Sequence, residues 1–247
     1  MAVFSELGVI PISIDGIKLS VGVWNHLVNS DDVSLIEQAY KFNFKHKLPY
    51  TSKIRLLLKK LGFCHAWENQ NTFSKNKLLK AIYNKLGDNF ISYWNRELYN
   101  DDNKTNKNKL RTYRELKSEY ILEKFLLLDI QKNIVSNFVK LRISNSNLLI
   151  EQGRHQNIPL ENRLCPICKL EIENEYHFVI ECNKLTSSRS KLYSKVTEIV
   201  PNFLFMSDSD KFKYILSSND YDIMKICVIG TSEMCSERNK LFKSNAK

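Results

Sequence analysis

The feature that most constrains the fold of this chain is a cluster of four side chains that can bind a metal. Cys165 and Cys168 are separated by two residues, His177 follows after eight more, and Cys182 after another four. Two cysteines at this spacing can hold one tetrahedral ion from a tight turn, and a histidine and a cysteine on a following turn complete the tetrahedron. Three thiolates and one imidazole leave no position for a reacting water. The spacing therefore predicts a structural zinc site, not a catalytic one.

The composition around this cluster favours helices. Only 7 Gly and 5 Pro occur in 247 residues, which argues against a loop-rich β-protein. Long runs of Lys, Leu, Asn, Glu and Ile without either residue favour helix formation. Hydrophobic residues make up 43% of the chain, enough for a packed core. We expect a mainly α fold: irregular helical bundle regions with one small CCHC zinc-binding motif.

Apolar periodicity and polar breaks divide the chain. Stripes of apolar residues predict helices over 53–61, which begins after Thr51-Ser52 and is closed by Gly62, and over 74–86, which is closed by Gly87. Residues 100–109 contain no apolar side chain and are expected to be a linker. The expected organisation is a helical region at 1–99, the polar linker at 100–109, one or two long helices within 110–160, the zinc-binding motif at 161–187, and short C-terminal helices with a tail at 188–247.

The first residues do not have the pattern of a secretory signal. Residues 1–14 lack a basic start and a continuous apolar core, and Glu6 interrupts them. No apolar stretch of about 18 residues or more occurs, so no membrane span is expected. In a chain without a secretory signal, clustered cysteines are better explained by metal binding than by disulfides. We expect an intracellular protein, nuclear or cytoplasmic and not secreted.

The net charge of +10 is concentrated in two windows. Residues 41–60 hold seven basic residues and no acidic one, and residues 104–117 hold six basic residues against Glu115. Such local excess is typical of surfaces that meet a polyanion, most often nucleic acid, although solvated helix faces are the alternative. The predicted contacts to the phosphates of RNA or DNA are Lys53, Arg55, Lys59, Lys60, Lys107, Lys109, Arg111 and Arg114.

The zinc-binding motif itself is acidic. Residues 161–187, here called the metal segment, hold five Glu against three basic residues. An acidic segment is a poor phosphate binder, so its expected role is to fix the surrounding fold or to contact a few bases or a protein. This leaves open a second hypothesis, a protein-interaction module with a structural zinc site and no nucleic-acid binding. A third hypothesis is an enzyme with an unrecognised site.

The residues around the cluster resemble a known family. The most specific matches are Leu141-Arg142-Ile143-Ser144, Ile150-Glu151-Gln152-Gly153-Arg154, Ile158-Pro159, Arg163, Cys165, Cys168, Glu175, His177, Phe178, Glu181 and Cys182. Softer matches upstream are Glu6-Leu7-Gly8 with Pro11, the stretch 35–40, and Lys109-Leu110-Arg111-Thr112-Tyr113. Together they resemble the segment that follows the reverse transcriptase domain in non-long-terminal-repeat retrotransposon polyproteins of the jockey type. One departure is His155, where such proteins have an aromatic residue.

The resemblance implies descent from a reverse transcriptase without its activity. The polymerase needs a Tyr-x-Asp-Asp turn between two apolar strands to hold Mg²⁺. Tyr99-Asn100-Asp101-Asp102 matches that string, but no apolar residue follows through Lys109, so the second strand is missing. We therefore expect no enzyme activity and no catalytic residues. The expected function is a zinc-stabilised nucleic-acid-binding accessory region, and the polymerase portion of a parent polyprotein is a further candidate partner.

Overall fold

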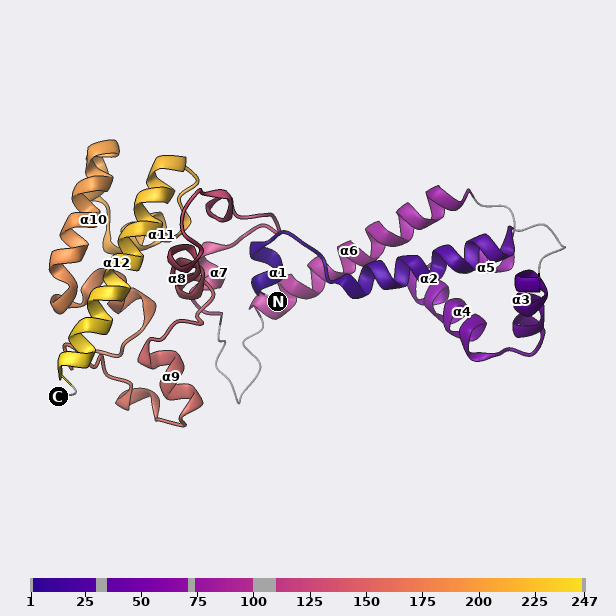
Figure 1. The fold of residues 1–247 in the computed structure, drawn as a ribbon, viewed down its shortest axis with the longest axis horizontal. Coiled ribbons are helices and arrows are strands. Elements are labelled where there is room, and N and C mark those ends of the chain that lie inside the picture. Colours follow the sequence, from indigo (N-terminus) through magenta and orange to yellow (C-terminus); the bar gives the residue numbers. More distant parts are fainter. Residues whose placement is uncertain (1, 30–34, 71–73, 100–109, 246–247) are drawn as a thin grey trace. The chain divides into compact units, whose positions relative to one another are not determined.

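The computed structural model describes residues 2–29, 35–70, 74–99 and 110–245. These residues are helical and contain no β-strand, so the prediction of a mainly α fold is confirmed (Figure 1). They form two compact units. The small unit is Val9–Glu97, and the large unit combines Met1–Gly8 with Leu98–Lys247. The predicted linker at 100–109 lies outside the described residues.

The small unit packs helices around one core. It contains α2 (Ile12–Val28), α3 (Leu35–Lys45), α4 (Pro49–Leu61), α5 (Cys64–Glu68) and most of α6 (Lys75–Tyr99). The hydrophobic residues of this core cluster are Val21, Trp24, Tyr40, Ile54, Leu58, Leu61, Ala66, Leu78 and Ile82. These side chains come from every helix of the unit, so each helix contributes to the core.

The helix predicted at 53–61 is present as α4 but begins earlier. Pro49 occupies its first turn, where a fixed φ and a missing N–H are tolerated. Thr51 is buried and donates its hydroxyl to the carbonyls of Asn43 and Leu48, so it closes the α3–α4 turn and is not the helix cap. The prediction for the end of the helix is confirmed, because Gly62 is the C-cap in the left-handed conformation at φ 85°.

The predicted helix end at Gly87 is wrong. α6 passes through this glycine without a break. A glycine inside a helix costs about 1 kcal/mol relative to alanine. The buried residues Ile82 and Trp94 on either side of Gly87 outweigh that cost, because both turns bury apolar surface.

The large unit is built from short elements that precede three longer helices. Its elements are α1 (Ala2–Glu6), α7 (Tyr113–Leu116), the 3₁₀ turns η1 (Lys124–Leu127) and η2 (Leu160–Asn162), α8 (Lys132–Arg142), α9 (Leu149–His155), the π-helix η3 (His177–Glu181), the 3₁₀ turns η4 (Asn183–Leu185) and η5 (Pro201–Phe205), α10 (Thr186–Ile199), α11 (Asp208–Ser217) and α12 (Tyr221–Asn245). α12 packs against both α8 and α10 (Figure 1).

One or two long helices were expected within 110–160, and the structure instead has the shorter helices α7, α8 and α9 there. Lys117 is buried, and its ammonium donates to the carbonyl of Ile121 and to the carboxylate of Glu123. A buried lysine needs such partners, so the chain folds back on itself after α7 and regular helix resumes only at α8. Short helices with a tail were expected at 188–247, and helices are present there, but α12 is long, with 25 residues.

Residues 2–8 belong to the large unit and not to the helices that follow them in sequence. Glu6 forms a buried ion pair with Arg142, at 3.2 Å. The backbone of Glu6 also accepts the N–H of Glu123, and Leu7 bridges Leu122. Gly8 has a φ of 61°, and a Cβ there would lie 2.4 Å from the Leu122 nitrogen. Only glycine allows this close approach of the two backbones.

Candidate metal centre

The first two ligands of the predicted site lie in a tight turn. An isolated bridge between Leu164 and Ile172 closes the loop that carries Cys165 and Cys168. The backbone N–H of Cys165 donates to the Glu171 carbonyl, and Lys169 donates back to the Cys165 carbonyl. Lys169 takes a left-handed φ of 61°, which reverses the chain directly after Cys168. This turn brings the two cysteine side chains to one point.

The other two ligands belong to a π-helical turn. His177 begins η3, and Cys182 directly follows its last residue. The backbone N–H of Cys182 donates to the His177 carbonyl over 2.8 Å, the i→i+5 hydrogen bond of a π-helix. This wider turn places residues five apart on the same side. The Asn174 side chain accepts the N–H of His177 and so holds the start of the turn.

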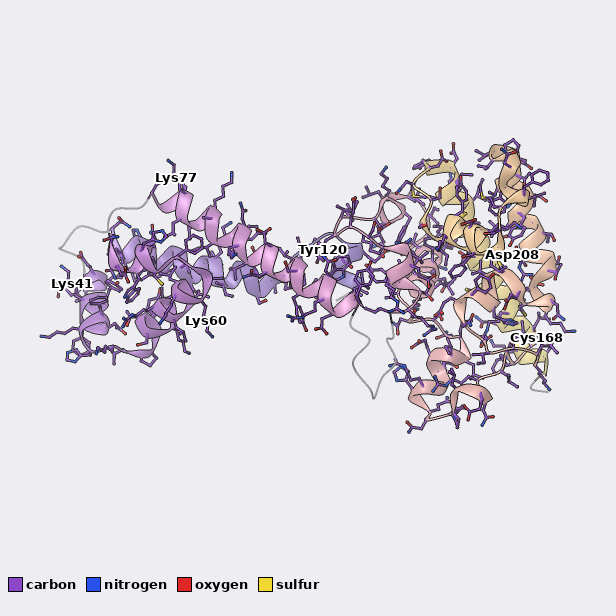
Figure 2. The ribbon with its side chains drawn as sticks, turned by 180° about the vertical axis from the view of Figure 1, so that it is seen from behind. Lys41, Lys60, Lys77, Tyr120, Cys168 and Asp208 are labelled. Atoms are coloured by element: carbon purple, nitrogen blue, oxygen red, sulfur yellow. The ribbon has the colours of Figure 1, made fainter. Side chains whose placement is uncertain are left out.

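The four predicted ligand residues converge. One sulfur or ring-nitrogen atom from each lies within 4.8 Å of all the others. The Sγ atoms of Cys165 and Cys182 are 3.9 Å apart, and Cys168 Sγ is 3.3 Å from His177 Nε2. A tetrahedron with Zn–S bonds of about 2.3 Å has its sulfur atoms roughly 3.8 Å apart. The arrangement is compatible with a structural metal such as zinc (Cys168 is labelled in Figure 2).

The ligands perturb one another's protonation. A hydrogen bond with Cys182, followed by burial, raises the pKa of the Cys165 thiol to about 12, and the same bond lowers the pKa of Cys182. Burial by itself lowers the pKa of His177, but hydrogen bonds to Cys165 and Cys168 and the negative charge on them outweigh it and raise this pKa to about 9. Cys165 and His177 thus hold their protons more tightly, whereas Cys182 releases its proton more readily. A divalent cation bound between these side chains would stabilise their deprotonated forms.

A second layer of charged groups surrounds the ligands. Glu173 lies 3.9 Å from Cys165 Sγ, and its carboxylate accepts two hydrogen bonds from the Arg238 guanidinium, at 2.6 and 2.7 Å. The same carboxylate accepts the N–H of Leu149 at the start of α9. Arg189 on α10 donates to the carbonyl of Cys182. The metal segment is therefore joined to α9, α10 and α12.

Both ring nitrogens of the His177 imidazole lie near polar groups, although Nδ1 makes no hydrogen bond. Nε2 of His177 faces Cys168, whereas Nδ1 lies 3.4 Å from the Glu181 carboxylate. A carboxylate at the second ring nitrogen is the usual orienting partner of a metal-binding histidine. The pairing of Arg238 with Glu173 was not predicted, because it depends on a contact across 65 residues of chain.

The acidic residues of the metal segment are divided between its surface and its interior, since Glu161, Glu171 and Glu181 are exposed and the other two are not. Glu173 and Glu175 are buried. Arg238 pairs with the first, and Arg111 bonds the second at 2.7 Å while also bonding Glu151 at 3.2 Å. Buried, paired carboxylates add little to the field outside the protein. The negative charge available at the surface of this segment therefore comes from Glu161, Glu171 and Glu181, and the hypothesis of a protein-interaction module stays a prediction.

The first basic window of the chain lies on an exposed face. Lys53, Arg55, Lys59 and Lys60 are all exposed on α4, as their positions off the apolar stripe predicted (Lys60 is labelled in Figure 2). The buried stripe of the same helix consists of Thr51, Ile54, Leu58 and Leu61. The cations therefore face solvent while the other side of α4 packs on the core.

The second basic window is described only in part. Lys107 and Lys109 lie outside the described residues. Arg111 bonds Glu151 and Glu175 within the large unit, and its contact to phosphate stays a prediction. Arg114 is half-buried on α7. Arg111 and Lys117, both in this window, form ion pairs with carboxylates of the large unit and so stabilise its fold.

Comparisons with protein-family models, with curated proteins and with solved structures find no match to this chain. No described helix combines the length and the apolar character needed to cross a membrane. Of the polymerase-like string, only Tyr99 is described, at the end of α6, and Asn100-Asp101-Asp102 lie outside the described residues.

Proposed function

We propose that the four converging ligands bind one Zn²⁺ and that this ion has a structural role. Three cysteines and one histidine form a closed tetrahedral shell without room for substrate or water. Cys165, His177 and Cys182 are buried, with exposures of 1%, 3% and 1%. Burial shields the ion from reactants and joins it to the packing of the large unit. Zinc would thus stabilise the fold and take no part in a reaction.

We further propose that the chain is a nucleic-acid-binding accessory protein. The observation that carries this proposal is the exposed cationic face of α4, in a window of twenty residues without an acidic side chain. Such a face attracts phosphates of RNA or DNA by releasing counterions, largely independently of sequence. The zinc site would keep the large unit folded while α4 and its neighbours make the contacts.

Binding to nucleic acid should weaken steeply as salt rises. We expect the wild-type protein to bind mixed-sequence oligonucleotides, with a log–log salt slope of about 0.7 to 0.9 per phosphate contact. Replacing Arg55 and Lys59 together by Gln should flatten that slope by about two contacts. Fluorescence anisotropy titrations at several salt concentrations measure both quantities.

The matched control removes two other exposed cations, Lys169 and Lys184, from the metal segment. This pair should affect binding less than the α4 pair. A larger loss in the control would place the binding surface on the metal segment and refute the role of α4.

The resemblance to jockey-type retrotransposon proteins supports an origin from the segment that follows a reverse transcriptase. On this proposal the chain has lost the polymerase site. No primer extension is expected on RNA or DNA templates with Mg²⁺ or Mn²⁺, because paired carboxylates on a strand hairpin are required to hold the ions. A radiolabelled primer assay tests this. Extension that disappears in Asp101→Asn would show that Tyr99 to Asp102 is a working metal site.

A further inference from the structure

A pocket of about 510 Å³ lies in the small unit, between α3, the turn after it, α4 and α5. Its volume falls within the roughly 300–1,000 Å³ range of ligand sites. The described residues that line it are Phe44, Lys47, Thr51, Ser52, Arg55, Leu56, Lys59 and Trp67. None of them is acidic, and three are cations.

α4 presents one of its two cationic faces to this pocket. Ser52, Arg55, Leu56 and Lys59 follow the i, i+3, i+4, i+7 spacing of one helix face, and all of them line the pocket. Lys53 and Lys60 are exposed on the same helix but do not line it. Arg55 and Lys59 therefore form a group of cations at the pocket that is separate from Lys53 and Lys60.

Aromatic rings form the apolar side of the pocket. Trp67 stacks on the buried Trp24, with ring centroids 5.7 Å apart, and Phe44 packs against Trp67 at 5.5 Å. These contacts hold the rings in place from the core side. Phe44 nevertheless remains 46% exposed. A ring fixed from behind and exposed in front offers a rigid stacking surface.

The third cation is held at the pocket by its backbone. Lys47 has a φ of 51°, a conformation that residues other than glycine rarely adopt. Its N–H donates to the Phe44 carbonyl, and its own carbonyl accepts the Ser52 hydroxyl. Both partners also line the pocket, so the turn places Lys47 beside the exposed ring.

We propose that this pocket receives one nucleotide of single-stranded RNA or DNA, with its base against Phe44 and Trp67 and its phosphates near Lys47, Arg55 and Lys59. This inference rests on the proposed nucleic-acid binding and specifies its form. Aromatic surfaces beside a cationic groove are what sequence-tolerant single-strand binding requires, because every base has a π-face. A base inside a duplex is already stacked, so single strands should bind in preference to duplexes.

Tryptophan fluorescence reports on the pocket directly. The chain has 3 Trp, and Trp24 and Trp94 are each 1% exposed, whereas Trp67 is half-buried in the pocket wall. Mixed-sequence single-stranded oligoribonucleotides and oligodeoxyribonucleotides should quench the emission of the full chain at low salt. Abasic oligonucleotides of equal length and charge should bind more weakly and leave the emission unchanged.

Phe44→Leu tests the stacking surface, with Phe42→Leu as the matched control. Both rings are exposed on α3, but only Phe44 lines the pocket. Phe44→Leu should lower the affinity for the base-bearing single strand by about 5- to 150-fold, the range for losing one stacked base. Its affinity for the abasic strand should not change. Phe42→Leu should bind both strands as the wild type does, and circular dichroism confirms that both variants fold.

The outcomes separate the two proposals. Equal affinity for abasic and base-bearing strands, with a normal salt slope, would overturn the pocket assignment and leave nucleic-acid binding intact. No binding of either strand at low salt would overturn both. A loss in Phe42→Leu equal to that in Phe44→Leu would also refute the pocket, because the exposed helix face and not the cavity would then carry the contact.

Discussion

Freshly purified protein is expected to contain one Zn²⁺ per chain, and Cys168→Ser is expected to contain none. The reason is the convergence of three sulfur atoms and one ring nitrogen within 4.8 Å. Structural zinc in small motifs contributes roughly 10–16 kcal/mol of apparent folding free energy at neutral pH. Elemental analysis of the wild type and the variant measures the metal content.

Removal of zinc should destabilise more than the metal segment. Cys165, Cys182 and Phe178 belong to the same hydrophobic core as residues of α8, α10 and α12. A chelator should therefore lower the melting temperature of the large unit as a whole, which circular dichroism and near-UV signals can follow.

Cys64→Ser is the matched control for Cys168→Ser. Its thiol is exposed on α5 in the small unit and has no part in the cluster. This variant should keep its zinc and its stability. Wild-type protein without zinc, or Cys168→Ser with a full equivalent, would contradict the proposed centre.

Arg238→Met should destabilise the large unit by about 3–5 kcal/mol, the usual cost of leaving a buried charge without its partner. Arg238 donates two hydrogen bonds to Glu173, and both side chains are buried. Burial by itself lowers the pKa of Arg238, but Glu173 outweighs it and raises that pKa, so the guanidinium stays charged. Without the guanidinium, the Glu173 carboxylate would be left beside the Cys165 sulfur. Urea denaturation of the zinc-loaded proteins measures the loss.

Two further variants show whether the unpaired charge is the cause. Arg238→Met combined with Glu173→Gln should recover part of the stability, because the neutral amide removes the unpaired charge. Lys240→Met, at an exposed position of the same helix, should change stability by less than about 0.5 kcal/mol. Additive losses in the double variant would show that the two residues act independently and would contradict the pair.

Local patterns in the sequence predicted several features correctly. The Cys165-to-Cys182 spacing identified the ligands that converge, because each pair lies within a single turn and needs no distant contact to approach. The apolar stripe and terminal glycine of α4 predicted a helix with its cations outside, since a helix face is set by positions three and four apart. The helical fold class followed from composition, because helix propensity is a property of the individual residues.

Charge distribution was predictable only in part. On α4, all four cations are exposed where the stripe indicated. In the window at 104–117, Arg111 and Lys117 bond to carboxylates of the large unit, which the sequence did not predict. The carboxylates of Glu151 and Glu175 lie 40 and 64 residues from Arg111 in sequence, and no spacing rule connects them.

The sequence by itself therefore determined the candidate metal ligands, the helical class and the outward charge of α4, because those properties depend on residues within one or two turns. The tertiary structure decided which acidic residues are buried and where several helices begin and end. It also decided that residues 2–8 pack against Leu122 and Arg142. It also formed the pocket beside Phe44, whose walls come from three helices. Each of these depends on which distant side chain is present to neutralise a charge or cover a ring, and only the assembled core supplies that partner.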